Sequence, residues 1–117
     1  MDIESVKKVA SLIYCKEITS VHIDDTQSIA KWCFDYEVSE YMSFEESVAD
    51  FCYLCKKYAL ERGYSLLSEQ GKKASSCGIY KNDNLSFELN GSISKYEYEA
   101  IVYATEIAAD YEIYKED

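Results

Sequence analysis

Two cysteines one helical turn apart form the most recognisable chemical motif in this sequence. Cys52 and Cys55 make a C-x-x-C pair, and this spacing brings two thiols to one side of a helix, where they could hold a metal ion or form a redox pair. A structural zinc site needs four ligands, however, and both thiols fall within an apolar stripe. We therefore expect both to pack in the core, and we predict no metal and no cofactor. The other candidate ligands are scattered singly: Cys15, His22, Cys33 and Cys77.

The single histidine offers a second candidate for chemistry. His22 and Asp24 are two residues apart in a segment that is predicted to be a strand, so Asp24 could orient the imidazole as a base. No nucleophile-elbow sequence of the G-x-S-x-G type accompanies them, and the four glycines do not cluster into a phosphate-binding loop. The sequence therefore favours a protein that is not an enzyme.

Acidic residues dominate the charge of the chain. The 117 residues include 22 acids and 12 bases, for a net charge of −10. Such a surface repels phosphates and anionic lipid headgroups, so we expect no direct binding of nucleic acid and no membrane binding. A basic protein partner is favoured instead. The excess is concentrated in residues 18–42, with five acids against one base, and in residues 94–117, with seven against two.

Three carboxylates in the predicted C-terminal helix are the main candidates for partner binding. Glu99, Glu106 and Asp110 are spaced i, i+7 and i+11, which puts them about 10.5 and 6 Å apart along one helix face. Phosphates repeat on a comparable scale, so this row could mimic a nucleic acid in a basic groove. The alternative is a solvated helix face that serves solubility. Other acids that could extend the patch are Asp24, Asp25, Asp35, Glu37 and Glu40.

Tyrosine is unusually frequent, with twelve residues. Tyrosine is amphipathic and enriched at binding hot spots. Tyr98, Tyr41 and Tyr53 fall outside the predicted apolar stripes, so we expect them to be exposed, and Tyr98 is included among the candidate contacts. The C-terminal helix has a predicted apolar stripe that includes Ala100, Ala104, Ile107 and Ala108. Four other tyrosines follow this stripe and are expected in the core: Tyr96, Tyr103, Tyr111 and Tyr114.

Hydrophobic periodicity predicts four helices and four strands. Helices are expected over residues 2–14, over 24–38 with Asp24 and Asp25 as caps, over 43–63, and from 94 to about 115. Ser43 with Glu46, and Ser94 with Glu97, have the spacing of capping boxes that would begin the last two helices. Gly63 would end the third helix. The strands are expected over 18–23, 64–69, 75–80 and 85–89. The inner face of the second helix would be Ile29, Trp32, Cys33 and Tyr36.

The predicted fold class is α+β, in a single domain over residues 1–117. Residues 1–42 form a helical N-terminal part, and residues 43–115 form an α-β-β-β-α unit. Its three strands make an antiparallel meander with both helices on one face. The element order of residues 43–113 resembles that of the double-stranded RNA-binding domain. That family begins its second helix with a basic cluster, whereas the matching residues 94–100 here are acidic and would repel RNA.

A small acidic, non-catalytic binding or inhibitor protein is the function that these patterns favour. Its partner would be a basic protein that handles nucleic acid, as for phage anti-defence proteins of the anti-CRISPR type or for toxin-immunity proteins. One alternative is a metal or redox protein that uses Cys52, Cys55 and His22. Another is an assembly protein that associates through a tyrosine-rich face, for example as a homodimer. The acidic N-terminus is unlike a secretory signal, and five cysteines fit free thiols, so a cytoplasmic location is expected.

Overall fold

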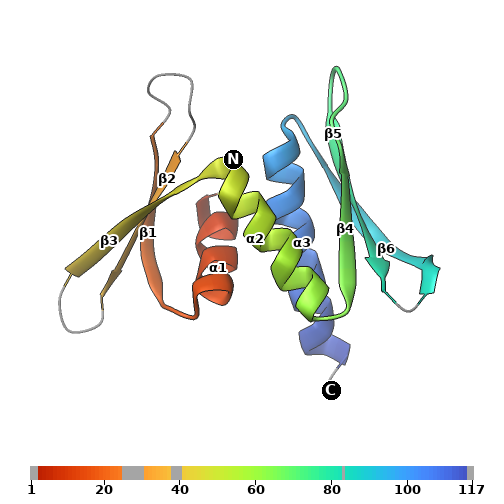
Figure 1. Ribbon diagram of the computed structural model, residues 1–117, viewed down its shortest axis with the longest axis horizontal. Coiled ribbons are helices and arrows are strands. Elements are labelled where there is room, and N and C mark those ends of the chain that lie inside the picture. The colour runs from red at the N-terminus through yellow and green to blue at the C-terminus, as the bar shows by residue number, and fades with distance from the viewer. Residues whose placement is uncertain (1–2, 25–30, 38–40, 83, 116–117) are drawn as a thin grey trace.

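In the part of the chain that the computed structural model describes, three helices lie between two separate antiparallel sheets (Figure 1). The structure describes residues 3–24, 31–37, 41–82 and 84–115. Helix α1 (Ile3–Tyr14) is followed by strands β1 (Ile18–Asp24), β2 (Lys31–Glu37) and β3 (Tyr41–Ser47). Helix α2 (Val48–Glu61), strands β4 (Tyr64–Glu69), β5 (Ser75–Lys81) and β6 (Asn84–Ser94), and helix α3 (Glu97–Lys115) complete the chain. The predicted α+β class is confirmed.

The N-terminal sheet replaces the helix that was predicted over residues 24–38. Residues 31–37 form the central strand of the order β1-β2-β3, with antiparallel pairing on both sides. Trp32 and Phe34 are fully buried, whereas Cys33 between them is only partly buried. This alternation is the period of a strand, and the predicted inner face had grouped Cys33 with Trp32. Up to residue 42, the described residues therefore form helix α1 and strands instead of a helical part, and residues 25–30 of the predicted helix lie outside the described part.

Helix α2 begins four residues later than its predicted capping box. Ser43 lies in β3, opposite Asp35 of β2, and the pairing continues to Ser47 opposite Lys31. The Ser47 side chain caps the helix by accepting a hydrogen bond from the Asp50 backbone N–H at 3.1 Å. The prediction for Ser43 was wrong because strand pairing holds this segment extended. At the other end, Gly63 takes a φ of +92° just after the helix, as predicted.

We expect Ser47→Ala to lower the free energy of unfolding by about 1 kcal/mol, because the Asp50 N–H loses its cap. Ser43→Ala is the matched control. Its side chain is exposed in β3, so the change is expected to stay within about 0.5 kcal/mol. Urea denaturation of both variants measures the difference. A larger loss for Ser43→Ala than for Ser47→Ala would contradict this helix start.

The C-terminal sheet follows its prediction closely. Strands β4, β5 and β6 pair in sequence order as an antiparallel meander, and α2 and α3 pack on the same side of it (Figure 1). The last strand was predicted over residues 85–89 and is longer, running from Asn84 to Ser94. A Cβ on Gly91 would lie 2.1 Å from the Cys77 carbonyl oxygen, so the close approach of β6 to β5 requires glycine here.

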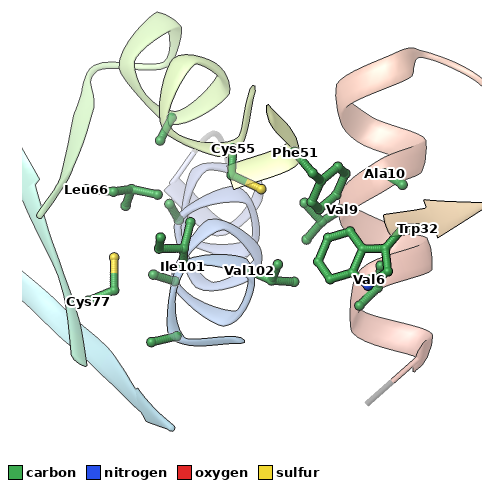
Figure 2. Packing of buried hydrophobic residues seen from close by; sticks show 14 of the residues in the cluster. Val6, Val9, Ala10, Trp32, Phe51, Cys55, Leu66, Cys77, Ile101 and Val102 are labelled. Atoms are coloured by element: carbon green, nitrogen blue, oxygen red, sulfur yellow. The ribbon is translucent and has the colours of Figure 1, made fainter. Parts of the chain in front are cut away.

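Helix α3 begins at Glu97, three residues after the predicted cap. Ser94 is the last residue of β6, so its capping-box prediction was wrong. The helix contacts α1, α2 and the C-terminal sheet. Figure 2 shows Ile101 directed toward Leu66 and Val102 directed toward Val6 and Trp32. Because α3 is covered on both sides, its buried residues do not form a single stripe: Glu99, Ala100, Ile101, Val102, Ala104, Thr105, Ala108 and Ala109.

One hydrophobic cluster joins the helices to both sheets. At its centre, Trp32 of β2 meets Phe51 of α2 edge-on, with 4.6 Å between ring centroids, and Phe34 lies 5.4 Å from Phe51. Val6 and Val9 bring the buried side of α1 to the same cluster (Figure 2). The two sheets therefore share a core through the helices between them.

Candidate functional site

The predicted acidic row on α3 is not a continuous solvent-facing row. Glu99 is 8% exposed, so its placement on a solvent face was wrong. Asp110 is partly exposed and forms an ion pair with Lys8 of α1, with 2.6 Å between Nζ and Oδ1. Glu106 is partly buried. The difference arises because α3 is an interior helix, whose sides face α1 and the C-terminal sheet.

The other predicted acids that the structure describes lie on the N-terminal sheet. Asp35 is a buried residue of β2, 4% exposed, so it was wrongly placed on an exposed patch. Asp24 and Glu37 are the last residues of β1 and β2. Asp25 and Glu40 lie outside the described residues. The members of this set that the structure describes lie on β1 and β2, whereas Glu99, Glu106 and Asp110 lie on α3.

A polar cluster on the N-terminal sheet was missed by the sequence analysis. The Asp35 carboxylate accepts a hydrogen bond from Ser20 Oγ at 2.5 Å and lies 3.1 Å from His22 Nε2. The sequence analysis expected Asp24 to orient the His22 imidazole. In the described residues, the carboxylate beside this ring is that of Asp35. Cross-strand register creates this contact, and the register was hidden because β2 had been predicted as a helix.

The tyrosines divide differently from the prediction. Tyr53 is 66% exposed, as expected. Tyr98, in contrast, packs against the core and meets Trp32 edge-on, with 5.9 Å between ring centroids. Tyr96 had been expected in the core and is 47% exposed. Tyr103 and Tyr111 are partly buried, and Tyr111 also packs against the core. The side chains of Tyr41 and Tyr114 lie outside the described set.

The cysteine pair lies mostly in the core. Cys55 is fully buried (Figure 2), and Cys52 packs against the same cluster. Burial raises the pKa of the Cys52 thiol from 9.0 to about 12 and that of Cys77 to about 11, and it also raises the pKa of Cys55. Such thiols stay protonated near neutral pH and are poor nucleophiles and metal ligands. Within residues 3–24, 31–37, 41–82 and 84–115, no three His, Cys, Asp or Glu residues gather as a metal site.

A groove on the outer face of the C-terminal sheet is a candidate site that the sequence analysis missed. Leu66 and Ile79 point into the core, so their neighbours Leu67, Gly78 and Tyr80 lie on the opposite face. The groove has a volume of about 410 Å³, and its lining includes Leu67, Tyr80 and Ile93. Gly78 makes room for the Tyr80 ring, since a Cβ there would lie 2.9 Å from Tyr80 Cε2.

Exposed aliphatic side chains and carboxylates meet in this groove. Ile93 is 79% exposed and Leu67 is 61% exposed, the highest values among the large aliphatic side chains described. Glu69 and Glu88 also line the groove, and both are exposed. In the sequence, Leu67 and Ile93 did not stand out because strand alternation alone does not tell which face of a sheet is covered. The groove combines apolar contact with negative charge.

Comparisons with protein-family models, curated proteins and solved structures found no match to this chain. In the described part of the chain, no helix has both the length and the apolar composition needed to cross a membrane.

Proposed function

We propose that this chain is a small, acidic, non-catalytic binding protein that holds a basic segment of a protein partner in the groove on β4-β5-β6. The observation that carries the proposal is the groove itself, where Leu67 and Ile93 are exposed beside Glu69 and Glu88. Covering an exposed Leu or Ile contributes about 1.5–3 kcal/mol of transfer free energy. The carboxylates would then select Lys or Arg in the partner.

The overall charge supports the same class of partner. A chain with a net charge of −10 attracts basic proteins over a distance and accelerates their encounter. More specifically, we propose that the partner is a protein that handles nucleic acid, because such proteins present basic surfaces to phosphates. Phage anti-defence proteins and toxin-immunity proteins act on partners of this kind. The binding surface proposed here differs from the predicted acidic row, since Glu99 is buried and Asp110 is paired with Lys8.

Selection from a short-peptide display library tests the groove without knowledge of the partner. We expect the wild-type protein to enrich peptides in which Lys or Arg stands beside apolar residues. The double substitution Glu69→Lys/Glu88→Lys is expected to weaken a selected peptide at least about tenfold. Leu67→Ser/Ile93→Ser should weaken it by a similar factor, through loss of apolar contact. Affinity should fall between about 50 and about 300 mM salt, because the charge attraction is screened.

The matched control is Glu17→Lys/Glu45→Lys, which makes the same change in net charge at two exposed residues away from the groove. We expect this control to lower the affinity for the selected peptide less than about threefold, since only the long-range electrostatic field of the protein changes. Equal losses for the groove and control variants would show that net charge alone drives binding. Enrichment of acidic or purely apolar peptides would also contradict the proposed partner.

A further inference from the structure

A second hollow in the molecule has the opposite charge. A pocket of about 750 Å³ lies where the first turns of α2 and α3 meet the turn between β4 and β5. These segments reach the same end of the molecule in Figure 1, shown at the top. The volume falls within the usual range of small-molecule sites. The pocket is separate from the groove on the outer face of the sheet, because their lining residues do not overlap.

Lysines concentrate in this pocket although the chain is strongly acidic. Four of the twelve basic residues line it, against one carboxylate, that of Glu97: Lys56, Lys72, Lys73 and Lys95. Lys72 and Lys73 are exposed on the turn, and neither makes an ion pair with any residue that the structure describes. Lys56 is held in place by donating to Ser68 Oγ at 3.0 Å. The lining therefore has positive charges that are available to an anion.

Backbone groups add to the positive potential. Val48 and Ala49 are the first two residues of α2, and Glu97 and Tyr98 are the first two of α3; all four line the pocket. The first backbone N–H groups of a helix have no partner within the helix, and the helix dipole places partial positive charge there. Two helix ends thus reinforce the four lysines.

Aromatic rings form the other part of the lining. Tyr53 is 66% exposed and Tyr96 is 47% exposed, and both line the pocket. Tyr96 stacks on Tyr98 with 5.6 Å between ring centroids and an interplanar angle of 8°. Lys95 Nζ lies 5.2 Å from the Tyr96 ring centroid. An exposed ring beside lysines is suited to a ligand that joins a flat ring to a phosphate group.

We propose that this pocket binds a small phosphate-bearing ligand with a flat ring, of the mononucleotide class. The phosphates would lie among Lys56, Lys72, Lys73 and the two helix ends. The base would stack on the exposed face of Tyr96 or Tyr53. The inference goes beyond the proposed function, because it concerns a different surface and a ligand of opposite charge.

The size of the ligand follows from the charge of the whole chain. At about 0.1 M salt, charges farther than about 10 Å are largely screened, so a ligand inside the pocket responds mainly to the local lysines. A long nucleic-acid strand would leave the pocket and run over a surface with an excess of carboxylates, which repels it. A mononucleotide is therefore favoured over a strand.

Isothermal titration calorimetry with ADP as the probe tests the proposal on the intact chain. We expect saturable binding, which Lys72→Gln/Lys73→Gln weakens at least about tenfold, because hydrogen bonds to charged phosphate are lost. Lys16→Gln/Lys57→Gln is the matched control: both lysines are exposed, neither lines the pocket, and the net charge changes equally. The control should bind ADP within about twofold of wild type. Circular dichroism on all variants verifies the fold.

Two further probes separate the ring from the phosphates. Pyrophosphate should bind more weakly than ADP, and Tyr96→Ala should lower the affinity for ADP about fivefold or more while leaving pyrophosphate unchanged. Absence of ADP binding, or equal losses in the lysine pair and its control, would overturn the site. Equal affinity for pyrophosphate and ADP would overturn the ring contact. If a single-stranded oligonucleotide bound more tightly than ADP, the proposed ligand class would be wrong and the ligand would be a nucleic-acid strand.

Discussion

Replacing Trp32 with alanine is expected to lower the free energy of unfolding by about 4 kcal/mol, within the 3–5 kcal/mol range for loss of a buried large aromatic side chain. Trp32 is fully buried and touches rings from three elements: Phe34 of β2, Phe51 of α2 and Tyr98 of α3. Alanine would leave a cavity at the point where the N-terminal sheet meets the helices. Because domains of this size have a free energy of unfolding of only about 5–15 kcal/mol, the substitution would remove a large part of the stability.

Trp32→Phe is the control for this prediction. Phenylalanine keeps most of the apolar volume, and it removes the indole N–H, which has no hydrogen-bond partner among the described residues. We expect a loss below about 1.5 kcal/mol. Denaturant unfolding followed by far-ultraviolet circular dichroism measures both variants without relying on the tryptophan signal. Equal losses for Phe and Ala would mean that the ring contacts contribute little.

Val102→Asp is expected to lower the free energy of unfolding by at least about 3 kcal/mol, because it places an unpaired carboxylate in the core. Val102 is fully buried between α3 and the group formed by Val6 and Trp32 (Figure 2). The single-stripe interpretation of this helix leaves Val102 off its buried face. The substitution therefore tests whether α3 is covered on both sides.

Ile107→Asp is the matched substitution on the same helix. The stripe predicted from the sequence includes Ile107, whereas the structure leaves it 36% exposed. We expect this variant to lose no more than about 1 kcal/mol, as for most partly exposed positions. Thermal unfolding of the two variants compares them directly. If Ile107→Asp were the more damaging change, α3 would be buried along its tyrosine stripe and the arrangement of the helices would be wrong.

The C-terminal unit could be predicted because its signals are local. Strands β4 and β5 lie within one residue of their predicted bounds, and Gly63 follows the end of α2 with a positive φ, as predicted. Each of these features depends on residues within one element or one turn. The same applies to Cys55, since a cysteine in an apolar helical stripe is an ordinary core residue.

The N-terminal sheet could not be predicted from local patterns, because it is set by contacts between strands. Trp32, Phe34 and Tyr36 alternate, but a short run of this kind fits a helix or a strand until its partners are known. Pairing of β2 with β1 and β3 decided the outcome, and the same pairing drew Ser43 into β3 despite its capping-box spacing. The contact of Asp35 with Ser20 and His22 follows from that register.

The sequence by itself determined the acidic charge, the α+β class and the elements of the C-terminal unit, because composition and local periodicity carry that information. The tertiary structure alone decided which charges and rings are available to a partner. It buried Glu99, paired Asp110 with Lys8, and exposed Leu67 and Ile93 on the outer face of a sheet. It also gathered Lys56, Lys72, Lys73 and Lys95 from three segments into one pocket. Residues distant in sequence become neighbours only through packing, and the side of a helix or sheet that meets solvent is set by what covers the other side.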